Sequence, residues 1–172
     1  MQTSRDLCRI AVIGAGYAGR DFALRCVRAG FDVTLEDVMP SRLRSAHHAF
    51  LSEAPSGALH LASTVEDAVR DADLAIDFVP DELESKLEIF SMLDRMAPPR
   101  TILCTPTRAL SIADLASCTY RPQLCFGLRF ANPDTSELMY TSRSSPEALS
   151  AVEQWLTAIG FTVTIAHDPS EP

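Results

Sequence analysis

A glycine-rich segment near the N-terminus has the spacing of a phosphate-binding loop. Gly14, Gly16 and Gly19 form the pattern G-x-G-x-x-G, with Tyr17 and Ala18 between the last two glycines. The first glycine permits a tight turn, the second lets a pyrophosphate approach the backbone, and the third lets a helix pack closely on the preceding strand. A helix beginning here directs free N–H groups and the positive end of its dipole toward phosphates. The segment therefore predicts a site for the pyrophosphate of a dinucleotide, and a glycine-rich turn without a ligand is the alternative.

An acidic pair follows at the distance expected for a ribose-binding residue. Asp37 stands 18 residues after Gly19, at the end of an expected strand. A carboxylate at this place accepts hydrogen bonds from the ribose hydroxyls and repels a 2′-phosphate. Glu36 adds negative charge, and the nearest arginine in the sequence is Arg42. These residues predict NAD rather than NADP as the cofactor. The alternative is that Asp37 is a solvated loop acid.

The elements that would position these residues alternate between strands and helices. Apolar runs predict strands over 9–13, 31–36, 59–62, 74–79, 101–105, 123–130 and 161–166, with an edge strand over 138–142. Amphipathic segments predict helices over 17–29, 41–52, 80–96, 111–116 and 145–160, and a capping box at 63–66 begins a short helix that reaches residue 71. This alternation predicts an α/β fold of the Rossmann type, with a doubly wound, mostly parallel sheet and helices on both faces. We expect one dinucleotide-binding domain over residues 1–172.

Composition excludes several classes of function. The formal net charge of −8 leaves no basic stripe to neutralise the phosphates of a nucleic acid. No apolar run approaches the ~20 residues of a membrane span. The five cysteines are scattered, and neither they nor the four histidines have the spacing of metal ligands. We therefore expect no metal, no nucleic acid and no membrane, and a cytoplasmic location.

Three segments together resemble a known family, the 3-hydroxyacyl-CoA dehydrogenases, in their NAD-binding domain. They are I-A-V-I-G-A-G at 10–16, D-A-D-L-A-I-D at 71–77 followed by Val79-Pro80, Glu84 and Lys86, and G-L-R-F-A-N-P at 127–133. The resemblance covers almost the whole chain. It implies NAD as cofactor and a set of cofactor-binding residues: Gly14, Gly16, Tyr17, Ala18, Gly19, Asp37, Val79, Pro80, Lys86 near the nicotinamide end, and Asn132.

The expected catalytic positions depart from the family pattern. The family's catalytic histidine falls at Arg129, and its substrate-contacting serine falls at Arg108. Glu137 aligns, after a short gap, with the glutamate that orients the histidine. Arginine has no acceptor lone pair and stays protonated, so it cannot act as the general base, whose loss costs on the order of 10²–10⁴ in rate. The two arginines could instead bind a carboxylate or phosphate, or stabilise an oxyanion. Drift in a degenerate site, or pairing of one arginine with Glu137 or Asp134, is the alternative.

Two functions follow from these residues. The first is an NAD-dependent oxidoreductase-like protein of this family, acting on a hydroxy or keto acyl substrate, small or carrier-bound, or on a small acid, with Arg129, Glu137 and Arg108 as candidate catalytic residues. The second is a catalytically degenerate NAD-binding or non-redox protein, serving as an accessory subunit or a biosynthetic-pathway enzyme. The resemblance places a helical C-terminal domain after the last strand, where this chain stops. We therefore expect a homodimer, or a partner protein in place of that domain, formed through residues 130–140 and the helix bearing Trp155.

Overall fold

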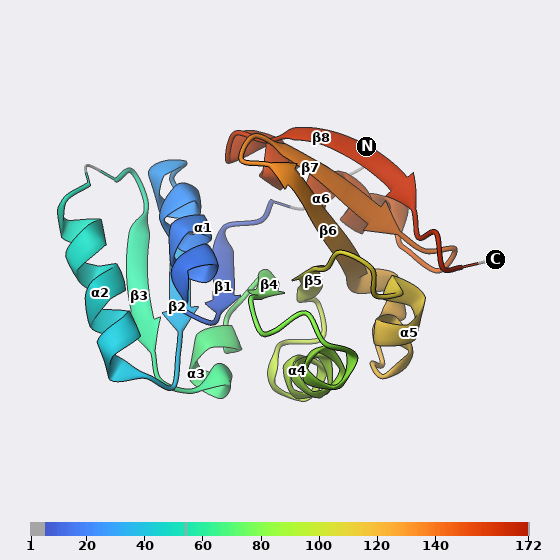
Figure 1. The fold of residues 1–172 in the computed structure, drawn as a ribbon, viewed down its shortest axis with the longest axis horizontal. Coiled ribbons are helices and arrows are strands. Elements are labelled where there is room, and N and C mark those ends of the chain that lie inside the picture. The colour runs from blue at the N-terminus through green and yellow to red at the C-terminus, as the bar shows by residue number, and fades with distance from the viewer. Residues whose placement is uncertain (1–5, 54, 172) are drawn as a thin grey trace.

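The computed structural model describes residues 6–53 and 55–171, which form an eight-stranded sheet with helices on both faces (Figure 1). The strands are β1 (Arg9–Ile13), β2 (Asp32–Glu36), β3 (Ala58–Ala62), β4 (Leu74–Asp77), β5 (Ile102–Pro106), β6 (Cys125–Asn132), β7 (Thr135–Tyr140) and β8 (Thr162–His167). The helices are α1 (Tyr17–Arg28), α2 (Pro40–Leu51), α3 (Val65–Val69), α4 (Leu83–Met96), α5 (Ile112–Ser117) and α6 (Pro146–Ala158), with a 3₁₀ turn η1 (Pro122–Leu124).

The strand order is that of a doubly wound sheet. It runs β3-β2-β1-β4-β5-β6-β7-β8. The first six strands in this order, which are β1 to β6 by number, are parallel to one another. The chain turns back at β7, which is antiparallel to β6, and β8 is parallel to β7. The order reverses between β1 and β4, and such a switch point is where ligands bind in open α/β sheets. The predicted Rossmann fold is confirmed.

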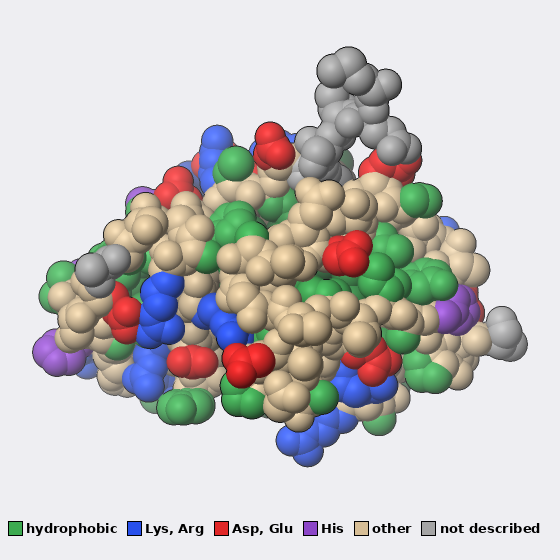
Figure 2. All heavy atoms as spheres, turned by 90° about the horizontal axis from the view of Figure 1, so that it is seen from above, with side chains coloured by type: hydrophobic (Ala, Val, Ile, Leu, Met, Phe, Trp, Pro, Cys, Tyr) green, Lys and Arg blue, Asp and Glu red, His purple; other side chains and the backbone are tan. Residues whose placement is uncertain are grey.

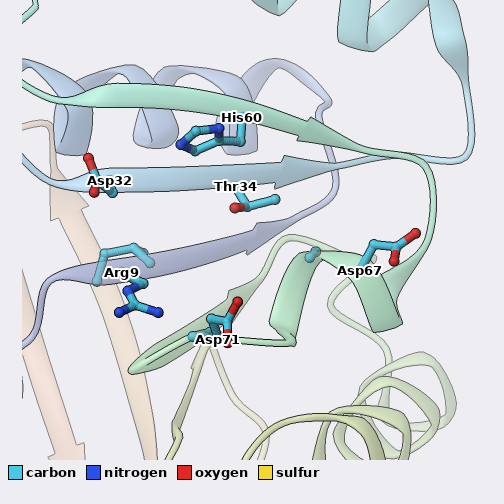
Figure 3. Close-up of a pocket in the computed structure, with 9 residues that line it drawn as sticks. Arg9, Asp32, Thr34, His60, Asp67 and Asp71 are labelled. Carbon is cyan, nitrogen blue, oxygen red and sulfur yellow. The ribbon is translucent and has the colours of Figure 1, made fainter.

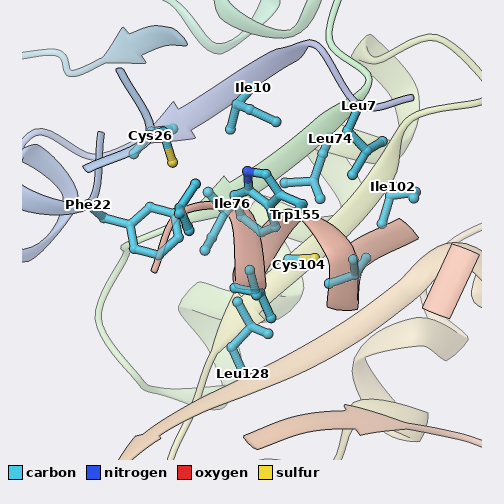
Figure 4. Packing of buried hydrophobic residues seen from close by; sticks show 14 of the residues in the cluster. Leu7, Ile10, Phe22, Cys26, Leu74, Ile76, Ile102, Cys104, Leu128 and Trp155 are labelled. Atoms are coloured by element: carbon cyan, nitrogen blue, oxygen red, sulfur yellow. The ribbon is translucent and has the colours of Figure 1, made fainter. Parts of the chain in front are cut away.

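Two hydrophobic clusters, one on each face, hold the sheet. On the face that α1 and α6 cover, Phe22 packs against Trp155 with ring centroids 5.6 Å apart, above Ile76 of β4 (Figure 4). On the other face α3, α4 and α5 bury a second cluster that includes Phe90 and Leu115. Both faces are covered because the central strands are apolar on both sides, as expected of parallel strands.

Three predicted details of the last third of the chain need correction. Of the segment predicted as an edge strand over 138–142, residues 138–140 belong to β7 and the last two lie beyond it. Because β7 lies between β6 and β8, β8 forms the edge of the sheet. Trp155 is only 2% exposed because it fills the space between α6 and α1. It therefore lies in the core and not on a surface open to a partner. The segment predicted as a strand from 123 begins instead with the turn η1.

Helix α1 begins at Tyr17 as predicted, whereas the starts of the later helices differ from the predicted ones by one to three residues. The hydroxyl of Thr64 accepts a hydrogen bond from the backbone N–H of Asp67, so the cap of α3 lies one residue later than the predicted box. Helix α4 begins at Leu83 and not at Pro80. Gly30 follows α1 with a φ of 97°, a left-handed conformation that glycine adopts without strain, and the predicted end of this helix is confirmed.

A buried arginine that the sequence analysis did not single out joins α4 to β5. The guanidinium of Arg121 donates to the carboxylate of Asp94 at 2.8 Å. It also donates to the backbone carbonyls of Pro98, Ala97 and Thr101, at 2.6, 3.2 and 3.2 Å. These bonds satisfy carbonyls at and after the C-terminus of α4, which have no partner within the helix. Arg121 therefore fixes the end of α4 against the sheet.

The surface carries charges of both signs. On the face drawn in Figure 2, acidic and basic side chains are interspersed among apolar and other side chains. In the described ranges no helix has the length and apolar character needed to cross a membrane. Within the same ranges, no group of three or more His, Cys, Asp or Glu side chains is arranged to hold a metal ion.

Candidate functional site

The glycine loop lies at the switch point of the sheet, between β1 and α1. Gly14 has a φ of 98° and its N–H donates to the carbonyl of Glu36 at 2.9 Å, which fixes the turn. A Cβ atom at Gly19 would overlap the carbonyl oxygen of Gly14, so no side chain fits there without moving the backbone. A Cβ atom at Gly16 would meet nothing within 4 Å. The space over Gly16 is thus open at the start of α1, and the loop fits a pyrophosphate.

A cavity of about 390 Å³ opens beside this loop at the carboxyl ends of β1, β2 and β4. Gly14, Asp37, Arg42, Val79 and Pro80 line it, so it brings together four of the predicted cofactor-binding residues. Its walls also include the apolar side chains Val38, Val65, Ile89 and Met92. A concave, mostly apolar space with a few polar groups suits the adenosine half of a dinucleotide.

Asp37 lies in this cavity with its carboxylate held by the backbone. One oxygen, Oδ2, accepts from the N–H of Ala15 and the other, Oδ1, accepts from the N–H of Met39, both at 2.8 Å. Arg42 Nη1 lies 3.3 Å from Oδ2. Burial raises the pKa of Asp37, but these hydrogen bonds and the arginine outweigh burial and hold the pKa below its usual value. Asp37 is therefore a fixed negative charge at physiological pH.

A second cavity, of about 380 Å³, lies at the carboxyl ends of β4, β5 and β6. Arg108 and Arg129 both line it, together with Ala18 of α1 and Lys86 of α4. Arg108 and Arg129, which follow different strands, thus line one cavity that also reaches the first turn of α1. We call this space the arginine cavity.

Arg129 faces Glu137 across the β6–β7 pair. The two residues are register partners, and Arg129 Nη1 lies 3.3 Å from each carboxylate oxygen of Glu137. This contact supports the alignment of Glu137, after a gap, with the glutamate that orients the family's histidine. It is also the pairing of Arg129 with Glu137 that the sequence left open as an alternative. The Nε–H of Arg129 is buried and has no hydrogen-bond partner. Glu137 therefore contacts only one of the three guanidinium nitrogens, Nη1.

Arg108 lies in the loop after β5, exposed at the rim of the arginine cavity. Its backbone N–H donates to the carboxylate of Asp81 at 2.9 Å, which ties this loop to the start of α4. Among the described residues none pairs with its guanidinium. The Arg108 side chain is thus a positive charge that a ligand in the cavity can reach.

Lys86 forms part of the floor of the arginine cavity and is paired with a buried acid. Its Nζ lies 2.8 Å from Asp77 Oδ1, and the two side chains are 1% and 0% exposed. Burial raises the pKa of Asp77, and Lys86 opposes this effect. The sequence offered no sign that Asp77, which lies within the strand predicted over 74–79, holds this lysine. Contact of Lys86 with the cofactor stays a prediction.

A third cavity, of about 440 Å³, adjoins the arginine cavity and shares Ala18, Phe78 and Phe130 with it. Tyr17, which is 81% exposed, stands at its edge, and its floor includes Phe22 and Phe161. We call it the aromatic cavity, because three of its phenylalanine rings contact one another.

Asn132 lies in the aromatic cavity and not with the arginines. Its side-chain oxygen accepts from the N–H of Asp134 at 2.9 Å, which closes the β6–β7 turn. Asn132 therefore shares a cavity with Tyr17 and Ala18 but not with Gly14, Asp37 and Val79, and its role toward the cofactor remains a prediction.

A fourth cavity lies apart from these, against the amino-terminal halves of β1, β2 and β3 (Figure 3). It measures about 250 Å³ and is lined by polar residues including Arg9, Asp32, His60 and Asp71. Of these residues only Asp71 lies in one of the three segments that carry the family resemblance, D-A-D-L-A-I-D at 71–77. They lie at the opposite end of the strands from the glycine loop, so they take no part in the site described above.

Comparison with known proteins connects this geometry to one family. Residues 9–58 and 51–168 match the family described as "3-hydroxyacyl-CoA dehydrogenase, NAD binding domain". A probable 3-hydroxybutyryl-CoA dehydrogenase of Bacillus subtilis is 32% identical over 144 residues, which cover 74% of this chain and 50% of that protein.

Two further relatives act on other kinds of substrate, according to their names. A 5-formyl-3-hydroxy-2-methylpyridine 4-carboxylate 5-dehydrogenase of Mesorhizobium japonicum is 25% identical, covering 88% of this chain and 55% of that protein. The solved structure of a diketoreductase, described as acting on dicarbonyl compounds, superposes with a TM-score of 0.85 at 27% identity, covering 98% of this chain and 66% of that one. The chain thus spans about half of the length of the curated relatives described here.

Proposed function

The chain belongs to the 3-hydroxyacyl-CoA dehydrogenase family, whose NAD-binding domain it spans, and we propose that it works as an NAD-dependent oxidoreductase on a hydroxy or keto substrate that carries an anionic group. The observation that carries this proposal is the arginine cavity, where Arg108 and Arg129 meet beside the glycine loop. Bound in its reduced form, NADH, the cofactor would supply the hydride for reduction of a keto group. The loop around Gly16 binds its pyrophosphate, and Asp37 the adenosine ribose.

The arginine cavity suits the binding of a carboxylate or phosphate. Arg129 has an Nε–H without a partner, and Arg108 has no partner among the described residues. A planar anion between them would accept charge-assisted hydrogen bonds from both guanidinium groups. Because arginine cannot accept a proton, Arg129 serves to orient the substrate and to stabilise negative charge on its oxygen. In reduction of a keto group, the guanidinium would stabilise the alkoxide that hydride transfer from NADH creates, and that alkoxide would take its proton from water.

The aromatic cavity suits an apolar extension of the substrate. It adjoins the arginine cavity through Ala18, Phe78 and Phe130. Its two arginines are already engaged, since Arg25 donates to the carbonyl of Pro133 and Arg28 pairs with Glu53. An acyl group fits such a lining better than a second charged group does. We therefore propose an acyl or aromatic acid, small or carrier-bound, as the substrate class.

The second candidate function is NAD binding without redox turnover. The contact between Arg129 and Glu137 favours it, because a carboxylate that would orient a histidine is instead held by an arginine. In that case the protein acts as an accessory subunit or a non-redox enzyme.

The setting of the protein is also a proposal. We propose a cytoplasmic protein, supported by the free and buried thiols of Cys26, Cys104 and Cys125, which are typical of a reducing compartment. We further propose a homodimer, or a complex with a partner protein, formed through residues 130–140 and helix α6.

The test is oxidation of NADH, followed at 340 nm with keto acids and keto acyl thioesters as substrates. We expect turnover with an anionic keto substrate. In Arg108→Ala and Arg129→Ala we expect KM for that substrate to rise about tenfold or more, with the affinity for NADH unchanged. Arg143→Ala, at an exposed residue after β7, is the matched control. Tight NADH binding without oxidation by any substrate would instead establish the second function.

A further inference from the structure

A positively charged residue lies beside the predicted ribose acid, although the sequence separates the two. Arg42 belongs to the first turn of α2, and the chain between β2 and α2 folds back so that Arg42 Nη1 is 3.3 Å from Asp37 Oδ2. Both residues line the cavity beside Gly14. The Arg42 side chain is 52% exposed and the Asp37 side chain 4%. The arginine is therefore free to move toward a ligand, whereas the acid is fixed.

The hydrogen bonds of Asp37 limit what it does to an incoming ligand. Its Oδ2 is shared between the N–H of Ala15 and Arg42, and its Oδ1 accepts from the N–H of Met39. Three donors already lie around the carboxylate, so its negative charge is partly compensated. It retains acceptor capacity for a ribose hydroxyl, because each carboxylate oxygen can accept two hydrogen bonds.

The neighbouring Glu36 is buried. Its side chain is 4% exposed, and burial, with the nearby charge of Asp37, raises its pKa. At the ribose end the exposed guanidinium of Arg42 thus lies beside the buried carboxylate of Asp37. A 2′-phosphate placed here would contact the guanidinium of Arg42, which can bind it, and the carboxylate of Asp37, which repels it. Arginine is the residue that accommodates this phosphate in related folds.

From this juxtaposition we infer that Arg42 is a second determinant of cofactor choice, which forms a 2′-phosphate subsite and lets the chain bind NADP in addition to NAD. Asp37 makes the affinity for NAD higher than that for NADP, and Arg42 reduces this difference by binding the 2′-phosphate of NADP. The inference rests on the proposed binding of a dinucleotide at this loop, and on no step of the proposed reaction.

The experiment measures binding of NAD and NADP to the whole chain by calorimetry. The variants are Arg42→Ala, Asp37→Asn, which keeps the shape of the side chain and removes its charge, and the double variant. Arg44→Ala is the matched control, an exposed arginine two positions further along α2. Thermal melting accompanies each variant, so that a loss of folding is separated from a loss of binding.

We expect Arg42→Ala to weaken NADP binding about tenfold and NAD binding less than twofold. Asp37→Asn should strengthen NADP binding, and the double variant should lose that gain; Arg44→Ala should change neither affinity. An equal effect of Arg42→Ala on both dinucleotides, or no effect on either, overturns the inference. So does a complete absence of NADP binding in both the native chain and Asp37→Asn. If neither dinucleotide binds the native chain, the proposed cofactor site is contradicted as well. If a dinucleotide binds but NADH is not oxidised, only the proposed reaction is contradicted.

Discussion

The buried pair beneath the arginine cavity gives a prediction that can be worked out from the structure. Lys86→Met replaces the ammonium with an apolar side chain of similar length, and Asp77 then stays in the core without its partner. The Lys86 Nζ to Asp77 Oδ1 distance is 2.8 Å and neither side chain is more than 1% exposed. Solvent therefore cannot replace the lost interaction.

The expected loss of stability is large. Removing one partner of a buried ion pair typically costs about 3–5 kcal/mol, because it leaves a charge in a medium of low dielectric constant. For a domain of this size each kcal/mol lowers the melting temperature by about 2–4 °C, so the midpoint should fall by roughly 6–20 °C. Arg95→Met, at an exposed residue of the same helix, is the control and should change the midpoint little.

The loss should also depend on pH in a defined direction. Burial already raises the pKa of Asp77, and removing Lys86 takes away the effect that lowers it. Below pH of about 4 the carboxyl is neutral in the folded and the unfolded chain, and it contributes no difference. Above that pH the unfolded chain releases the proton while the folded chain retains it, so the free energy of unfolding falls as the pH rises. The variant should therefore be closest to the native protein in acid.

Chemical denaturation of the native chain, Lys86→Met and the double variant Asp77→Asn/Lys86→Met, at pH values between 4 and 8, measures both effects. The double variant has no charge to bury and should recover stability relative to Lys86→Met at neutral pH. A loss below about 1 kcal/mol in Lys86→Met, or a loss that does not grow with pH, would refute the reasoning.

Three further predictions concern stability. Gly19→Ala should lower the free energy of unfolding by roughly 1–3 kcal/mol, seen in denaturant melts, since its Cβ would overlap the carbonyl of Gly14; an unchanged melt would contradict this packing. Arg121→Met should cost about 3–5 kcal/mol by the same assay, because the carboxylate of Asp94 then stays buried without its guanidinium. The buried carboxyl of Asp168 has a pKa held below its usual value, because hydrogen bonds outweigh the effect of burial; native stability should therefore fall as the pH drops below about 4, and Asp168→Asn should reduce that pH dependence.

The sequence predicted the features that local pattern determines. Alternating apolar runs and helical segments were enough to place the strands of the parallel part of the sheet, and the spacing of Gly14, Gly16 and Gly19 was enough to place the loop at its switch point. A glycine that must have a positive φ, such as Gly30, is visible in sequence because few other residues adopt that conformation.

The features that the sequence did not predict depend on contacts between distant residues. The pairing of β7 with β8 made the predicted edge strand an inner one, and no local pattern encodes which strand comes last. Arg121 and Asp94 are 27 residues apart, and their pairing depends on how α4 packs against the sheet. The approach of Arg42 to Asp37 depends on the angle at which α2 leaves β2.

The central claim is that a dinucleotide binds at the glycine loop, and binding of NADH to the native chain and to Gly16→Val tests it most directly. The backbone at Gly16 has a φ of −62°, and a Cβ there meets no atom within 4 Å, so the variant should fold and melt close to the native chain. Its side chain would occupy the place of the pyrophosphate. We expect NADH to bind the native chain and raise its melting temperature, and to do neither in Gly16→Val. Equal binding by the two proteins, or no binding by a folded native chain, would contradict the claim.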